Sequence, residues 1–282
     1  MSIALTLLAV ASAADEPHLW VRGYTAVAAQ PVGLIADVAV EARTPVLRYG
    51  GAVSNDTFAG AGVRVAASPA HLDLAARATF KPLDILPITV EGVYTAYWES
   101  PWGVIPRDQV AGQRTADRQP AYDADEDFAA HALAVSISPT LQLKVGPIAA
   151  FTNVTPTWIR VRGAGDPDPW LFEPYRGMVI APDDRIVDHL SAVLFDPFDG
   201  DGTPIVRIGP MLRGRAGHQT GDVTLMTGGI LQLRPGRNPH DADLTLLVAP
   251  YLRDPDFAVG APYIAALVSV ARVVPFKKVI GD

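Results

Sequence analysis

Residues 71–81 read His-Leu-Asp-Leu-Ala-Ala-Arg-Ala-Thr-Phe-Lys, and this stretch decides the fold. Leucine, alanine and phenylalanine occupy every second position from 72 to 80, whereas Asp73, Arg77 and Lys81 fall on the other alternate set. Successive side chains of a β-strand point to opposite sides, so this strand has one apolar face and one ionic face. A soluble β-sandwich buries the apolar face. A transmembrane β-barrel turns it to lipid and encloses the ionic face.

The same alternation recurs along the chain, and proline or glycine punctuates nearly every boundary between segments. Strand lengths of about nine to eleven residues fit a tilted crossing of the hydrocarbon layer. We expect strands near 19–29, 33–45, 57–67, 71–81, 87–98, 127–137, 141–154, 185–195, 204–215, 222–234, 243–253 and 263–274. An even number of strands returns both ends of a closed barrel to the same side.

One alternate face of these segments is free of ionisable side chains, and the other carries eleven basic and four acidic residues. This charged set is Asp37, Glu41, Arg43, Arg64, Asp73, Arg77, Lys81, Glu91, Lys144, Arg207, Arg213, Arg215, Arg234, Arg253 and Arg272. A two-sheet sandwich with its charged face in water also alternates in this way. The many long strands joined by hairpins favour a barrel. The predicted fold class is therefore all-β, a closed antiparallel transmembrane β-barrel of about twelve strands.

The connections between strands differ in length. Ser138-Pro139-Thr140 reads as a tight turn, whereas 99–126 and 155–184 are long and are expected to form two extracellular loops. Gly146-Pro147 and Gly209-Pro210 fall inside predicted strands, where we interpret them as β-bulges that help the sheet curve. The same pairs are also compatible with a sheet that does not close. Aromatic residues near strand ends suggest interfacial girdles: Trp20, Phe80, Trp98, Phe128, Phe151, Trp158, Phe195, Tyr251 and Tyr263.

The N-terminus resembles a secretory signal. Residues 3–10 are apolar, and Ala11-Ser12-Ala13 forms a small-x-small cleavage pattern, although no basic residue precedes them. The alternative is a buried strand. We predict a signal peptide at 1–13 and a single β-barrel domain at 14–282. The chain has no cysteine, so its fold does not depend on disulfides.

Taken together, the strand pattern and the signal-like N-terminus resemble bacterial outer-membrane β-barrel proteins as a class, over most of residues 19–274. The resemblance implies export to the cell outer membrane and contact with outer-membrane lipid. Such proteins commonly end on an aromatic residue, whereas here Phe276 is followed by six further residues.

The charge distribution predicts the function. The chain has a net charge of −7, yet the face expected to line the lumen is mostly basic. A lumen lined with arginine concentrates anions, so we predict a porin-like channel for small solutes with a mildly anion-favouring lumen. The predicted lumen-lining residues are Arg43, Arg64, Arg77, Lys144, Arg207, Arg213, Arg215, Arg234 and Arg253. In the alternative, these charges pair with one another and merely fill the barrel.

Two other functions stay open. The barrel is structural or binds a partner through the loops 99–126 and 155–184, or it is, less favourably, a lipid hydrolase. His189 and Ser191 share one alternate face, as a catalytic pair requires, while Asp188 points to the opposite face and cannot orient the histidine. GxSxG, HExxH and P-loop motifs are absent, so we predict no enzyme, no cofactor and no metal site. A pI near 5.3 argues against nucleic-acid binding.

Overall fold

The computed structural model describes residues 16–29, 33–46, 57–98, 105–107, 129–163, 170–173, 178–197, 205–234, 242–253, 260 and 262–275. The predicted signal peptide and Phe276 lie outside these ranges. Within them, no helix is long and apolar enough to cross a membrane.

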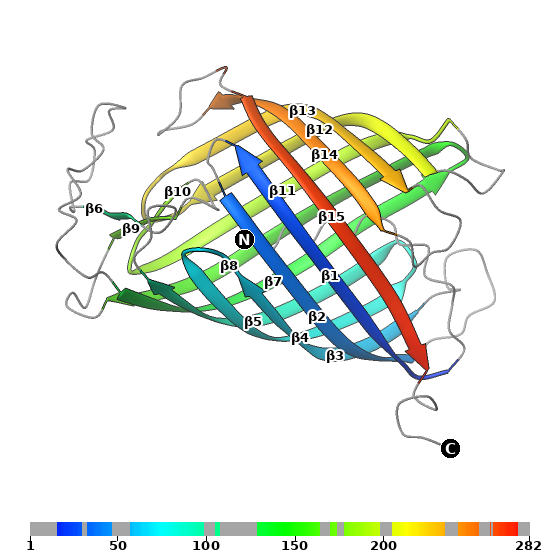
Figure 1. Cartoon of the computed structure of the whole chain (residues 1–282), viewed down its shortest axis with the longest axis horizontal. Helices are drawn as coiled ribbons and strands as arrows, with labels where there is room; N and C mark the ends of the chain where they lie inside the picture. The colour runs from blue at the N-terminus through cyan, green and yellow to red at the C-terminus, as the bar shows by residue number, and fades with distance from the viewer. Residues whose placement is uncertain are drawn as a thin grey trace.

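Twelve strands form one closed antiparallel barrel (Figure 1). They are β1 (His18–Ala29), β2 (Gly33–Pro45), β3 (Phe58–Ala67), β4 (His71–Leu83), β5 (Leu86–Trp98), β7 (Ala129–Val145), β8 (Ile148–Gly163), β11 (Asp183–Phe195), β12 (Ile205–Gly217), β13 (Val223–Arg234), β14 (Asp243–Arg253) and β15 (Pro262–Pro275). Each strand pairs with its neighbours in sequence, and β1 pairs with β15 from His18↔Pro275 to Ala29↔Ile264. The predicted fold class and strand number are confirmed.

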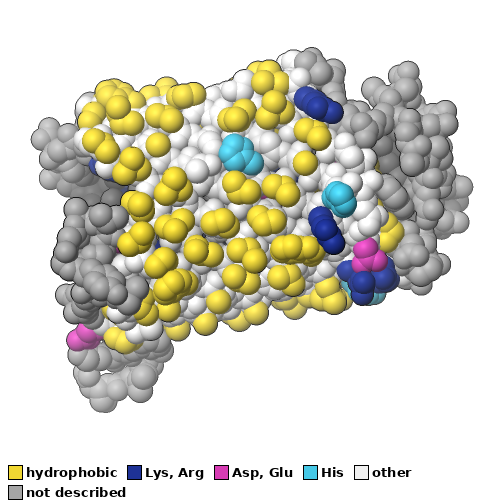
Figure 2. Space-filling model, turned by 180° about the vertical axis from the view of Figure 1, so that it is seen from behind, with side chains coloured by type: hydrophobic (Ala, Val, Ile, Leu, Met, Phe, Trp, Pro, Cys, Tyr) yellow, Lys and Arg dark blue, Asp and Glu magenta, His cyan; other side chains and the backbone are white. Residues whose placement is uncertain are grey.

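The apolar alternate face lies on the outside of the barrel. In β4, Leu74 and Phe80 are exposed, whereas Asp73, Arg77 and Lys81 are buried. Figure 2 shows hydrophobic side chains spread over the outer surface, with few charged side chains among them. A soluble sandwich buries its apolar face, so this arrangement is that of a membrane barrel.

Small side chains on the inner face make room for long charged ones. Ala39 lies in register between Arg22 of β1 and Arg64 of β3, and Ala75 of β4 follows Arg64 in the same row. Ala39 is completely buried, and Ala75 is nearly so. This alternation of arginine and alanine explains how a barrel of twelve strands encloses so many large polar side chains.

The turn predicted at Ser138-Pro139-Thr140 is wrong. β7 continues through Pro139, which pairs in register with Ile88, and the chain reverses at Gly146-Pro147 instead. Gly146 has φ +54°, in the left-handed region that glycine adopts readily. The period-2 pattern of outward Leu133, Val135 and Ile137 runs on past the proline, which accounts for the longer strand.

The bulge interpretation of the Gly-Pro pairs is also wrong. Gly146-Pro147 forms a turn, and Gly209-Pro210 lies inside β12 without an extra residue in either ladder. Pairing of β12 with β11 stops at Ala192↔Met211 and resumes at Phe195↔Ile208 in the same register. Proline has no N–H to donate, so the ladder is interrupted there without a shift.

The two long connections contain ordered strands. Residues 155–163 belong to β8, and β6 (Ile105–Arg107), β9 (Trp170–Glu173) and β10 (Met178–Ile180) form a separate three-stranded sheet at one end of the barrel (Figure 1). The rest of the two loops, at 99–104, 108–128, 164–169 and 174–177, lies outside the described residues. Met178 and Ile180 are each 1% exposed, and they pack with inward residues of the barrel strands: Tyr97, Ala130, Ala132, Ala134, Ile159, Val161 and Ile186. β10 therefore fills this end of the interior.

Only part of the predicted aromatic girdle is on the outside. Phe80, Trp98, Trp158 and Phe195 are 40–49% exposed and lie toward the ends of their strands. Phe151 is partly buried and lines the interior, and Phe128 is outside the described residues. Trp20, Tyr251 and Tyr263 are buried on the inner face. Trp20 and Tyr251 share the alternate set of Arg22 and Asp243, and Tyr263 shares that of the buried Ala265 and Leu267.

Candidate functional site: the central cavity

Seven of the nine residues predicted to line the lumen are buried, each with at most 9% relative exposure. They are Arg43, Arg64, Arg77, Arg207, Arg213, Arg215 and Arg234. Lys144 and Arg253 are exposed at the ends of β7 and β14. Both belong to the inner alternate set, but their strands have already left the closed part of the barrel. Arg272 is exposed on the outer set of β15, opposite to its predicted side.

The interior also contains charges that the sequence interpretation missed. Asp188, Asp196 and Asp243 form ion pairs with Arg215, Arg207 and Arg234, respectively. The interior is therefore closer to charge balance than the eleven basic and four acidic residues predicted from the sequence suggest. Arg22 of β1 is a further buried cation. Its place on the same alternate set as Trp20 and Tyr24 could have identified it from the sequence.

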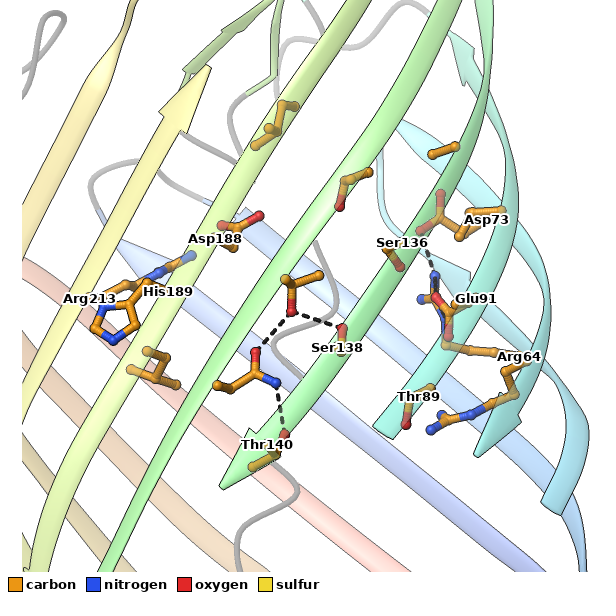
Figure 3. A pocket seen from close by; sticks show the side chains of 18 of the residues that line it. Arg64, Asp73, Thr89, Glu91, Ser136, Ser138, Thr140, Asp188, His189 and Arg213 are labelled. Atoms are coloured by element: carbon orange, nitrogen blue, oxygen red, sulfur yellow. Dashed lines mark hydrogen bonds and ion pairs between the residues drawn. The ribbon is translucent and has the colours of Figure 1, made fainter. Parts of the chain in front are cut away.

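Arg64 is the centre of a network that spans four neighbouring strands. Its Nη1 donates to Asp37 Oδ2 of β2 at 2.9 Å, and its Nη2 lies 3.4 Å from Asp73 Oδ2 of β4 and 3.0 Å from Glu91 Oε1 of β5. Thr95 donates to the second oxygen of Asp73 at 2.7 Å. Each nitrogen of the Arg64 guanidinium thus has a carboxylate partner, and two of the three carboxylates, Asp73 and Glu91, are seen beside it in Figure 3.

A cavity of about 140 Å³ lies beside this network. Hydroxyl and amide side chains of β7 and β8 line the side away from Arg64, joined by hydrogen bonds from Ser138 to Thr155, Thr155 to Asn153 and Asn153 to Thr140 (Figure 3). The charged residues that line it are Arg22, Arg64, Arg77, Arg213, Asp73, Glu91 and Asp188. Four arginines thus face three carboxylates. Among the described residues, no group of three potential metal ligands is found.

Two of these arginines are poorly satisfied. The Nε, Nη1 and Nη2 atoms of Arg22 are all buried, and within the described part of the chain none of them has a hydrogen-bond partner. It forms a long ion pair with Asp37, whose Oδ1 is 3.7 Å from Nη2, beyond hydrogen-bond distance. Arg77 places Nε 3.6 Å from Glu41 Oε2, which is also beyond hydrogen-bond distance.

His189 and Ser191 do meet, on the outer side of the barrel. Ser191 Oγ lies 2.7 Å from His189 Nε2 and 2.7 Å from Thr152 Oγ1 of β8. His189 borders the cavity beside Asp188 (Figure 3), but its hydrogen bonds are made to these two outer hydroxyls. Asp188 instead accepts from Arg215 on the inner face, as its position in the strand predicted.

The depth of this pair bears on the hydrolase hypothesis. Arg185 of β11 lies opposite the exposed Trp158, beside the exposed Arg160–Asp183 ion pair, and these residues indicate one edge of the apolar band. His189 is four residues further along, about 13 Å along the strand at 3.3 Å per residue and about 10 Å in depth for a strand tilted by about 40°. Lipid ester groups lie at the edge of the hydrocarbon layer. The pair therefore faces acyl chains rather than esters, and this geometry does not favour hydrolysis.

Comparison with known proteins points to the fold. No protein-family model and no curated protein sequence matches the chain. The structure is similar to the β domain of the Bordetella autotransporter BrkA, with a TM-score of 0.51 and 11% identity, covering 92% of this chain and 100% of that one. A KdgM porin solved with disordered oligogalacturonate has a TM-score of 0.41 and 9% identity, covering 89% and 97%. The translocator domain of the autotransporter NalP from Neisseria meningitidis has a TM-score of 0.41 and 10% identity, covering 90% and 88%. The likeness to BrkA agrees with the strand topology, and the chain has the fold of bacterial outer-membrane β-barrels.

Proposed function

We propose that this protein lies in the bacterial outer membrane and passes small solutes through the barrel, with a mild preference for anions. The apolar outer face supports the location, because a barrel in lipid exposes that face and encloses its polar one. The polar central cavity supports the passage of solutes.

The observation that carries this proposal is the composition of the cavity wall. Among the residues that line the cavity, four arginines (Arg22, Arg64, Arg77 and Arg213) outnumber three carboxylates (Asp73, Glu91 and Asp188) by one. Asp37 and Glu41 lie behind this lining, 2.9–3.7 Å from three of the arginines. Fixed charge inside low-dielectric walls focuses the field and raises the local concentration of oppositely charged solutes. The hydroxyl groups on the other side of the cavity can take over hydrogen bonds from a partly dehydrated ion.

The filled interior limits the size of the solute. The Arg64 network fills the interior along β2–β5 beside the cavity, and Met178 and Ile180 of β10 occupy one end. A solute of a few heavy atoms fits a cavity of about 140 Å³, whereas a large oligomer does not. We therefore expect a low conductance that depends on movement of these side chains.

Recordings of the full chain in planar lipid bilayers test the proposal. In a KCl gradient the reversal potential of the wild type should indicate a higher permeability for chloride than for potassium. Arg213→Gln should reduce that preference, because it removes one positive charge from the cavity lining. Arg185→Gln is the matched control, because Arg185 is exposed on the outer set of β11. A cation preference, or no conductance from protein that has been shown to be folded, would contradict the proposal.

A further inference from the structure

Arg22 stands out among the buried cations because its guanidinium makes no hydrogen bond within the described structure. Its side chain is 6% exposed, and its three nitrogens have no hydrogen-bond partner among the described residues. A buried donor without an acceptor loses the hydrogen bonds it makes in water, and a buried charge loses more. Such a group persists in a fold most easily when something else supplies the missing acceptor.

The carboxylate nearest to Arg22 is already engaged. Asp37 Oδ2 accepts from Arg64 at 2.9 Å, and Oδ1 stays 3.7 Å from Arg22 Nη2. Asp37 therefore neutralises part of the charge of Arg22 without completing its hydrogen bonds. In contrast, Arg64 has three carboxylates within 3.4 Å.

The surroundings hold the Arg22 guanidinium in place. Its central carbon lies 5.5 Å from the ring centroids of both Trp20 and Tyr24, the neighbouring inward residues of β1. In the two ladders Arg22 is flanked by Ala39 and Ala271, which leave space beside it. A planar cation positioned by aromatic rings keeps its five N–H donors in a fixed fork.

We propose that Arg22, together with Arg77, forms a binding site in the central cavity for a small oxyanion, the carboxylate or phosphate group of a solute. Both arginines line this cavity, and Nε of each lacks a hydrogen-bond partner. The guanidinium fork matches the two oxygens of a carboxylate or phosphate, and these charge-assisted hydrogen bonds are stronger than neutral ones. The inference rests on the proposed passage of anions and names the chemical class that the barrel selects.

The competing explanation is that Arg22 fills space and is hydrated by water in the cavity. The two explanations differ in what Arg22→Gln does. A filling residue contributes to stability, so its replacement should destabilise the barrel and leave anions without effect. An anion ligand should behave in the opposite way, because removing a buried charge without hydrogen bonds offsets the loss of its 3.7 Å contact with Asp37 and of its contacts with the Trp20 and Tyr24 rings.

Thermal unfolding of the full chain in detergent, with and without inorganic phosphate at constant ionic strength set by chloride, separates these outcomes. Phosphate should raise the melting temperature of the wild type, because a ligand of the native state stabilises by mass action. Arg22→Gln should melt no lower than the wild type without phosphate, and phosphate should not raise its melting temperature. Equilibrium dialysis should show phosphate affinity weakened at least about tenfold in this variant. Acetate as a second probe distinguishes a site for carboxylates from one for phosphates alone.

Arg207→Gln is the matched control. Arg207 is as deeply buried as Arg22, but it pairs with Asp196 and Gln232 away from the cavity. This variant should lose stability and keep the response to phosphate. No response in the wild type, or an equal response in Arg22→Gln, would overturn the inference. A barrel that conducts chloride without binding either probe would refute this site but not the proposed function. A barrel that binds phosphate without conducting would refute the proposed function but not this site.

Discussion

At the scale of single residues, Arg64 links four strands through its charge. Asp37, Asp73 and Glu91 come from β2, β4 and β5, and Arg64 itself comes from β3. Three carboxylates this close together repel one another unless a cation stands between them. Arg64 is therefore a structural residue first, whereas Arg22 has the unsatisfied donors that a ligand needs.

This difference predicts the effect of Arg64→Gln. Removing Arg64 takes the shared cation away from three buried or nearly buried carboxylates, which should lower the free energy of unfolding by about 3–5 kcal/mol. Urea unfolding of the detergent-solubilised protein measures the change. Arg160→Gln is the control, because the Arg160–Asp183 pair is well exposed and surface pairs contribute little. Equal effects of the two substitutions would show that the network does not hold the strands together.

The residue scale also shows where sequence reasoning was incomplete. Alternation alone identified seven buried arginines, since a strand fixes which side a residue occupies. It did not show where the strand leaves the barrel, so Lys144 and Arg253 were misjudged. Nor could it find the partners of each charge, because Asp188 meets Arg215 only through the pairing of β11 with β12.

At the scale of elements, β12 approaches β11 unusually closely at Gly209. A Cβ built at Gly209 would lie 1.8 Å from the carbonyl oxygen of Val193, whereas one at Gly92 of β5 meets nothing within 4 Å. The close approach occurs next to Pro210, where the ladder between the two strands is interrupted. Glycine is needed here for space, not for an unusual φ.

We therefore expect Gly209→Ala to destabilise the barrel by about 1–3 kcal/mol, because the backbone of one strand must shift. Gly92→Ala should change stability by less than about 0.5 kcal/mol. Thermal unfolding of both variants in the same detergent compares them directly. If Gly209→Ala changed stability as little as Gly92→Ala, the inference that β11 and β12 are too close for a side chain at position 209 would be wrong.

The strands could be predicted from the sequence, whereas several of their turns could not. All twelve strands follow the period-2 alternation, which is set by the two faces of the sheet. Turn positions were inferred from proline, but proline excludes only one backbone donor and β7 tolerates it at Pro139. The small sheet of β6, β9 and β10 pairs segments from two different connections, and no local pattern announces such a pairing.

At the scale of the whole molecule, the apolar band on the outside predicts how the protein responds to charge. Leu141 is 50% exposed on β7, six residues beyond the level of Trp158 at one edge of the apolar band, and Val145 is 67% exposed at the end of the strand. In lipid, a lysine at mid-depth costs about 2–4 kcal/mol, falling to about 0–1 near the interface. A soluble protein tolerates both substitutions equally.

Leu141→Lys should therefore destabilise the barrel in lipid vesicles much more than Val145→Lys does. Urea unfolding in vesicles, with folded protein identified by its faster migration on unheated gels, provides the measurement. Identical stabilities for the two variants, or wild-type protein that migrates the same with and without boiling, would argue against a membrane barrel.

The seam between β1 and β15 can form only late in the assembly of the barrel. Twelve residue pairs join strands from opposite ends of the chain, so neither strand can complete its hydrogen bonds until nearly the whole polypeptide has been assembled. Until then the barrel has two open edges, which are prone to pairing with other chains. Arg22 lies on β1 opposite Ala271, directly on this seam. The enclosed wall around Arg22 exists only after the seam has formed, so oxyanion binding would report the last step of assembly as well as the presence of a solute.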